Sequence, residues 1–179
     1  MNRPTPDEYF MTIAQAVRAR ANCLGRRVGA VLVRDRRILS TGYNGTPSKM
    51  VNCDEGGCRR CARPDQYASG EGYDVCICVH AEQNTLLGAA RFGVSVEGCT
   101  IYTTLQPCFG CLKELIQAKV IEVCYLHPWP SKFEDQYRAL VAQFEPGRFR
   151  QVAIPDPDEE WARGRGAPLE RALGHESQG

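Results

Sequence analysis

The chain has 179 residues, ten of them cysteine, and a formal net charge of +1. This length suits one domain with a core of its own, and the nearly balanced charge excludes a general electrostatic pull toward nucleic acid or membranes. No apolar run approaches the length of a membrane span, and the first residues lack a signal-peptide core, so a cytoplasmic protein is expected.

The N-terminal part predicts a helix followed by a hairpin. Apolar residues recur at helical spacing from Asp7 to about Arg20, and Pro6 suits a helix start. Residues 28–33 form a short apolar run that is typical of a buried strand. A polar turn at 35–37 and a return strand at 38–43 complete the expected hairpin.

Asn44 follows the return strand in the segment Asn44-Gly45-Thr46-Pro47. An Asn-Gly pair can simply be a turn dipeptide. Alternatively, an amide at a strand end can hydrogen-bond a sugar hydroxyl in an adjacent pocket. The residues alone leave both interpretations open.

Residues 48–79 show no periodicity and are rich in glycine and cysteine. A loop this long inside a small domain needs a stabilising feature, and a closed zinc site would supply one. One zinc uses four thiols, and which four is not evident from the sequence. Free thiols on a disordered insertion are the alternative. The available thiols, including one upstream, are Cys23, Cys53, Cys58, Cys61, Cys76 and Cys78.

The second half predicts alternating helices and strands. Helices are expected from His80 to about Arg91, with Gly93 as the stop, from Cys108 onward, and over 132–144. Strands are expected over 100–105, 120–126 and, at an edge, 149–154. This alternation predicts an α/β fold with a mixed or parallel sheet covered by helices. From residue 155 to 179 the composition favours a mobile tail, and a helical turn is expected within it over 169–173.

Two short motifs carry the predicted chemistry, His80-Ala81-Glu82 and Pro107-Cys108-Phe109-Gly110-Cys111. A catalytic zinc takes three protein ligands and keeps one position open for water, and His80, Cys108 and Cys111 supply those three. Glu82 is then suited to shuttle protons beside the metal. The alternative is a closed structural zinc site, with Glu82 only a first-turn acid favoured by the helix dipole.

These motifs, in this order, are the signature of zinc-dependent nucleobase deaminases. The chain resembles the deoxycytidylate branch of the cytidine and deoxycytidylate deaminase superfamily. The resemblance covers roughly residues 9–130 and is carried by 22–31, 41–47, 76–84 and 107–111. It implies a three-layer α/β/α fold with a five-stranded mixed sheet, formed by residues 1–154 with 48–79 as a cysteine-rich insertion.

The resemblance also implies the roles of individual residues. His80, Cys108 and Cys111 would bind the catalytic zinc, Glu82 would carry protons, and Asn44 would hold the sugar. The cysteines from Cys23 to Cys78 would supply one structural zinc. Relatives are often hexamers that respond to deoxycytidine and thymidine triphosphates, and Arg91 falls near where that regulation is felt.

The expected activity is hydrolytic deamination of deoxycytidylate (dCMP) to deoxyuridylate (dUMP) and ammonia, which supplies dUMP for thymidylate synthesis. Arg26 and Arg27 are candidates to bind the substrate phosphate, because a guanidinium pairs with phosphate oxygens; the alternative is a solvated basic turn. One rival hypothesis is a deaminase of the same fold acting on a nucleoside, a free base or transfer RNA. The other is a zinc-stabilised binding module without catalysis.

Overall fold

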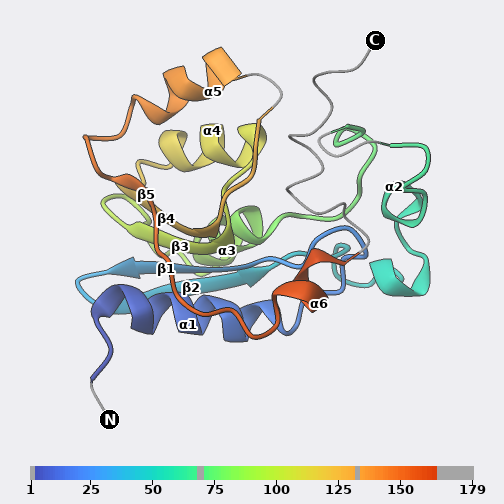
Figure 1. Cartoon of the computed structure of the whole chain (residues 1–179), viewed down its shortest axis with the longest axis horizontal. Helices are drawn as coiled ribbons and strands as arrows, with labels where there is room; N and C mark the ends of the chain where they lie inside the picture. Colours follow the sequence, from blue (N-terminus) through green and yellow to red (C-terminus); the bar gives the residue numbers. More distant parts are fainter. Residues whose placement is uncertain (1–2, 68–70, 132–133, 165–179) are drawn as a thin grey trace.

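The computed structural model describes residues 3–67, 71–131 and 134–164. At its centre is a five-stranded sheet with the strand order β2-β1-β3-β4-β5 (Figure 1). β1 is antiparallel to both β2 and β3, whereas β3, β4 and β5 are mutually parallel, which confirms the predicted mixed sheet. The strands are Gly29–Arg34 (β1), Arg37–Tyr43 (β2), Thr100–Leu105 (β3), Glu122–His127 (β4) and Phe149–Gln151 (β5).

Helices cover both faces of this sheet, which confirms the three-layer α/β/α fold (Figure 1). Helix α1 (Pro6–Arg18) lies on one face. Helices α3 (Ala81–Arg91), α4 (Phe109–Gln117) and α5 (Glu134–Val141) lie on the other. Within the described residues, none of the helices has the length and apolar character needed to cross a membrane.

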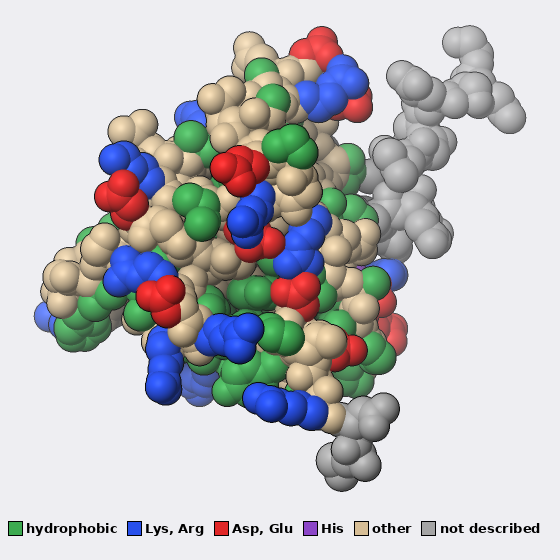
Figure 2. Space-filling model, turned by 90° about the vertical axis from the view of Figure 1, so that its left-hand side faces the viewer, with side chains coloured by type: hydrophobic (Ala, Val, Ile, Leu, Met, Phe, Trp, Pro, Cys, Tyr) green, Lys and Arg blue, Asp and Glu red, His purple; other side chains and the backbone are tan. Residues whose placement is uncertain are grey.

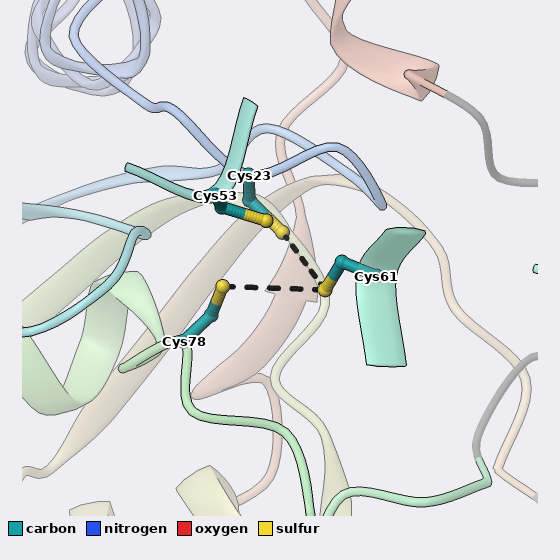
Figure 3. Close-up of side chains that lie close together, drawn as sticks. All are labelled: Cys23, Cys53, Cys61 and Cys78. Atoms are coloured by element: carbon teal, nitrogen blue, oxygen red, sulfur yellow. Dashed lines mark hydrogen bonds between the residues drawn. The ribbon is translucent and has the colours of Figure 1, made fainter. Parts of the chain in front are cut away.

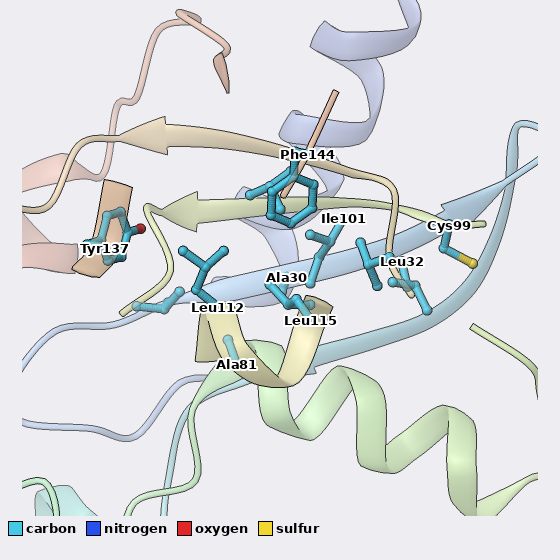
Figure 4. Packing of buried hydrophobic residues seen from close by; sticks show 12 residues of the cluster. Ala30, Leu32, Ala81, Cys99, Ile101, Leu112, Leu115, Tyr137 and Phe144 are labelled. Carbon is cyan, nitrogen blue, oxygen red and sulfur yellow. The ribbon is translucent and has the colours of Figure 1, made fainter. Parts of the chain in front are cut away.

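Side chains of the central strands alternate between two separate cores, as the period of a β-strand requires. Leu32 of β1 joins Leu112 of α4 in the larger core (Figure 4). Its neighbour Val31 points to the opposite face and joins Met11 of α1 in the second core. The sheet is therefore buried on both sides and holds the elements around the site rigidly.

Helix α1 is fixed at its start and along its length. Thr5 caps the helix and Glu8 reciprocates by accepting a hydrogen bond from the backbone N–H of Thr5, a capping box. Gly29 lets the helix approach β1 closely, because a Cβ there would collide with the carbonyl oxygen of Ala14.

Short helices lie in two segments where none was expected. Residues 48–79 were expected to lack regular structure, and residues 155–179 were expected to form a mobile tail. The cysteine-rich segment contains a 3-10 turn, Cys53–Glu55 (η1), and α2 (Arg59–Ala62). Residues 155–164 pack against the domain and include α6 (Glu159–Arg163), so this part of the expected tail is attached to the domain. The helical turn expected over 169–173 lies outside the described residues.

Candidate active site

One end of the sheet collects the residues that the sequence singled out. Ala30 of β1 pairs with Thr103 of β3, and Gly29 pairs with Tyr43 of β2. The start of β1, the end of β2 and the end of β3 therefore lie together. Sites in open α/β sheets form at the carboxyl ends of the strands, and β3 leads from this end directly into α4.

Three side chains that can bind a metal ion converge at this end. The Sγ atoms of Cys108 and Cys111 lie 3.4 Å and 3.3 Å from Nδ1 of His80. A tetrahedral zinc, with its usual bond lengths to nitrogen and sulfur, holds such donor atoms about 3.6 Å apart. The three donors thus fit one zinc ion, and no fourth His, Cys, Asp or Glu ligand joins this group among the described residues.

The two helices that meet at this group favour negative charge on its sulfurs. His80 is the residue that precedes α3, and Cys108 precedes α4, so the positive ends of both helix dipoles point at the site. The hydrogen bond between Cys108 and Cys111, together with the adjacent His80 ring, lowers the pKa of the Cys108 thiol to about 4 against the opposing effect of burial, whereas the same hydrogen bond and burial raise the pKa of the Cys111 thiol. Thiolate is the form that binds metal.

Glu82 lies in the first turn of α3, beside the three donors, and is almost completely buried. Burial raises the pKa of its carboxyl group to about 7. The hydroxyl of Thr103, on the central strand β3, donates to Oε1 of Glu82 over 3.4 Å. A carboxyl group with a pKa near neutrality can both accept and release a proton at working pH.

Close packing fixes the position of α3. A Cβ on Gly42 of β2 would collide with the carbonyl oxygen of Ala81 and with Thr85. Gln83 donates from its side chain to Glu114 of α4 over 2.9 Å, which ties together the two helices that supply the donors.

Asn44 directly follows β2, and its buried amide holds the segment before β1. Its Oδ1 accepts from the backbone N–H of Val28 over 2.8 Å, and its Nδ2 donates to the carbonyl of Arg26 over 2.6 Å. An amide group can form up to four hydrogen bonds, so the side chain keeps capacity for a ligand.

Arg26 and Arg27 line a pocket at the same end of the sheet. The guanidinium of Arg27 donates to the carbonyl of Trp161 over 2.7 Å and stacks over its ring, 4.6 Å from the centroid. Helix α6 thus supports one wall of the pocket. The pocket is lined by Arg18, Arg26, Arg27, Thr104, Leu105, His127, Glu159, Ala162 and Arg163.

A buried ion pair beside this pocket escaped prediction from the sequence. Arg18 of α1 donates through both Nη atoms to Asp156, at 2.7 Å and 2.6 Å, and His127 lies 2.7 Å from the same carboxylate. Burial opposes ionisation of Asp156, but the hydrogen bonds from Arg18 and His127 lower its pKa to about 2. No local pattern in the sequence predicts this contact, because Arg18 is far from His127 and Asp156 in the chain.

Two other residues that the sequence did not single out support the site, one from a strand and one from a helix. Thr103 contacts Glu82 as described, and Tyr137 of α5 donates from its hydroxyl to the carbonyl of Pro107 over 2.7 Å. Thr103 could have been predicted from the sequence, because it faces inward on the strand expected just before the Pro-Cys motif. Arg91 lies at the far end of α3, where it stacks on Phe92.

The six cysteines predicted as structural ligands form one buried cluster (Figure 3). Two overlapping groups of four have all their sulfur atoms within 4.8 Å of one another. One group draws on the loop before β1, η1, α2 and the segment before α3, and Figure 3 shows its four side chains pointing toward one another. The groups are Cys23, Cys53, Cys61 and Cys78, and Cys58, Cys61, Cys76 and Cys78.

Comparison with known proteins gives a consistent match. Residues 4–127 match the family model of the cytidine and deoxycytidylate deaminase zinc-binding region. The chain is 40% identical over 154 residues to a deoxycytidylate deaminase of Schizosaccharomyces pombe, covering 86% of this chain and 46% of that protein. It therefore spans about half the length of that relative.

The chain matches a larger share of a shorter relative and of a solved structure. The deoxycytidylate deaminase of Mycobacterium phage D29 is 41% identical over 128 residues, which cover 68% of this chain and 94% of the phage protein. The dCMP deaminase of cyanophage S-TIM5, solved in complex with dCMP and dUMP, superposes with a TM-score of 0.64 at 28% identity. The superposition covers 85% of this chain and all of that one.

Proposed function

Because the chain belongs to the cytidine and deoxycytidylate deaminase family, we propose that it is a zinc-dependent enzyme that hydrolyses dCMP to dUMP and ammonia. The observation that carries this proposal is the convergence of His80, Cys108 and Cys111 beside a buried carboxyl group, Glu82. The deoxycytidylate deaminases among its relatives support the choice of base and nucleotide.

In this proposal His80, Cys108 and Cys111 hold the catalytic zinc. Zinc bound there would lower the pKa of a water molecule and so supply the nucleophile. Glu82 moves the protons: it takes one from the attacking water and gives it to ring N3 of cytosine, which makes C4 electrophilic, and it then takes one from the new hydroxyl at C4 and gives it to the departing amine. The overall reaction consumes one water, replaces the amine at C4 by a carbonyl and releases ammonia.

The basic pocket supports a phosphate-binding role for Arg26 and Arg27. Arg18 lines the same pocket, is almost fully buried, and has no hydrogen-bond partner for its Nε within the described part of the chain. Both Nη atoms of Arg18 already donate to Asp156, so only its Nε–H is left unsatisfied, and a buried N–H without an acceptor is costly. Arg27 would keep its contact with Trp161 or exchange it for a phosphate oxygen.

Asn44 is proposed to hydrogen-bond the sugar with the donor and acceptor capacity that its backbone contacts leave. Its contacts to both sides of the segment 26–28 would couple sugar binding to the phosphate pocket. The cysteine cluster is proposed to hold structural zinc, since four thiolates make a closed site.

We also propose a homo-oligomer, a hexamer by resemblance, in the cytoplasm, with deoxycytidine and thymidine triphosphates as candidate effectors. The exposed apolar side chains of Leu87 and Phe92 on or next to α3 support burial against another copy. Arg91 lies between them and would be close to such an interface.

The proposal is tested by measuring ammonia release from dCMP, cytidylate, deoxycytidine and cytidine with the zinc-loaded full chain. We expect dCMP to be the best substrate by kcat/KM. Preference for a nucleoside would contradict the phosphate assignment. No release from any of them would favour a base in RNA or a binding module. The mixture of Lys and Arg with Asp and Glu on the face shown in Figure 2 argues against an RNA-binding surface there.

A further inference from the structure

The cysteine cluster has more ligands than one metal ion can use. The six cysteine side chains of the cluster lie close together, and five of them are buried. The two groups of four share Cys61 and Cys78. Each group by itself has the composition of a closed tetrahedral zinc site.

The distances between sulfurs match the edges of two tetrahedra. An ion about 2.3 Å from each of four thiolates holds the sulfurs about 3.8 Å apart. Cys61 lies 3.7 Å from Cys23 in one group and 3.7 Å from Cys76 in the other. Cys61 and Cys78, the shared pair, lie 4.0 Å apart, as two ligands common to both tetrahedra should (Figure 3).

The two sulfurs outside the first group have the same spacing. Cys58 is fully buried and lies 3.8 Å from Cys76. If a single ion occupied the group of Cys23, these two thiols would be left without a role at ligand spacing. A second ion gives all six sulfurs a partner.

We infer that the cluster holds two zinc ions, each with four thiolate ligands, with Cys61 and Cys78 bridging both. Zinc is the expected metal because it has no redox chemistry and favours tetrahedral thiolate sites. Six thiolates and two divalent ions leave a net charge of −2, which nearby donors offset. The backbone N–H of Leu24 donates to Cys53 over 3.4 Å, and the N–H groups of Cys61 and Ile77 donate to Cys58.

Such a cluster would connect the cysteine-rich segment to the catalytic site. Between residues 51 and 79 the described chain has only η1 and α2 as regular elements, so metal–sulfur bonds would supply much of the local stability. Bridging Cys78 lies two positions before His80 in the chain. The two-ion cluster would therefore hold the start of the segment that supplies the first catalytic ligand.

The test is the zinc content of the full chain, measured by native mass spectrometry under reducing conditions. We expect three ions in the unmodified protein, one at His80 and two in the cluster. Cys76→Ala and Cys58→Ala should each lower the count to two. Cys99→Ala is the matched control: it removes a buried thiol that belongs to neither group and should leave three ions.

His80→Ala separates this inference from the proposed function. If the unmodified chain binds two ions and His80→Ala binds one, the two-ion cluster is wrong and the catalytic site stands. If both bind two, the cluster stands and the catalytic assignment is wrong.

A second measurement avoids variants that fail to fold. In the cadmium-substituted protein, two cadmium nuclei that share a sulfur should show scalar coupling to each other by NMR. A single cluster resonance without coupling would overturn the inference.

Discussion

Glu82 combines two properties that rarely occur together in a side chain without a chemical role. It is almost completely buried, and no cationic Lys or Arg pairs with it among the contacts of the described residues. Burial of a carboxyl group is costly for its charged form, and here it raises the pKa of Glu82 to about 7. In the proposed function, its position next to His80, Cys108 and Cys111 lets Glu82 transfer protons beside the metal.

Glu82→Gln should therefore abolish most of the activity and keep the metal. The amide has nearly the same size but cannot carry a proton, so we expect kcat to fall by about 10²–10⁴-fold. Zinc content measured alongside dCMP deamination checks the result. Turnover within about tenfold of the unmodified enzyme, with zinc bound, would show that Glu82 is not the proton carrier.

Arg26→Ala combined with Arg27→Ala should weaken recognition of the phosphate. Loss of two guanidinium groups from the pocket should reduce the preference for dCMP over deoxycytidine by more than about tenfold, because charge-assisted hydrogen bonds are the strong ones. The ratio of the two kcat/KM values is the measurement. The control is Arg37→Ala, which removes an exposed arginine on β2 and should leave the ratio unchanged. If the double variant keeps a ratio close to that of the unmodified protein, Arg26 and Arg27 form only a structural basic turn.

At the level of elements, α6 and the segment before it show how a tail can complete a site. Asp156 is buried against Arg18 of α1 and His127 at the end of β4. The backbone N–H of Arg27 donates to Ala162 of α6 over 2.8 Å. Three parts of the chain thus meet at the basic pocket, and the segment after β5 closes it.

Asp156→Ala should destabilise the fold, because it leaves the buried guanidinium of Arg18 without its partner. Removing one member of a buried pair costs about 3–5 kcal/mol, measured as the free energy of unfolding in urea. Asp135→Ala, which removes an exposed carboxylate that pairs with Arg138 on α5, should change it little. Equal effects of the two substitutions would contradict the buried pair.

The same pair predicts a dependence of stability on pH. The pKa of Asp156 is lowered in the folded state to about 2, so its contribution is fully present above its ordinary pKa of 3.8 and is lost as pH falls toward 2. Asp156→Asn should show a smaller loss of unfolding free energy over this range than the unmodified protein. A parallel loss in both would exclude Asp156 as a source of acid sensitivity.

Sequence periodicity was sufficient to predict most elements and a sheet covered by helices, whereas the three-layer arrangement came from the resemblance to the family. The helix beginning after His80, the hairpin and the central strand 100–105 have local patterns that tertiary contacts did not overrule. Helix α6 was missed because its five residues carry one apolar aromatic, Trp161, amid charged neighbours, and its stability comes from contact with Arg27. The partners of Asn44 and Asp156 depend on the folded arrangement, which no local pattern encodes.

For the whole molecule, the sheet topology explains why residues distant in sequence form one site. Antiparallel β1 brings residues 26–28 to the end of β3, while parallel β3 and β4 bring Cys108 and His127 to that end. The mixed sheet thus places the three candidate metal ligands, the candidate proton carrier Glu82 and the basic pocket on connected elements. The cysteine cluster gathers side chains of the remaining irregular segment, which precedes His80.

The most direct test of this account is an anomalous difference map from crystals of the zinc-loaded protein, recorded at the zinc absorption edge. The account predicts a peak within bonding distance of Nδ1 of His80 and of Sγ of Cys108 and Cys111, without a fourth protein ligand. No peak between these three atoms, or a fourth side chain bound to the ion, would contradict it.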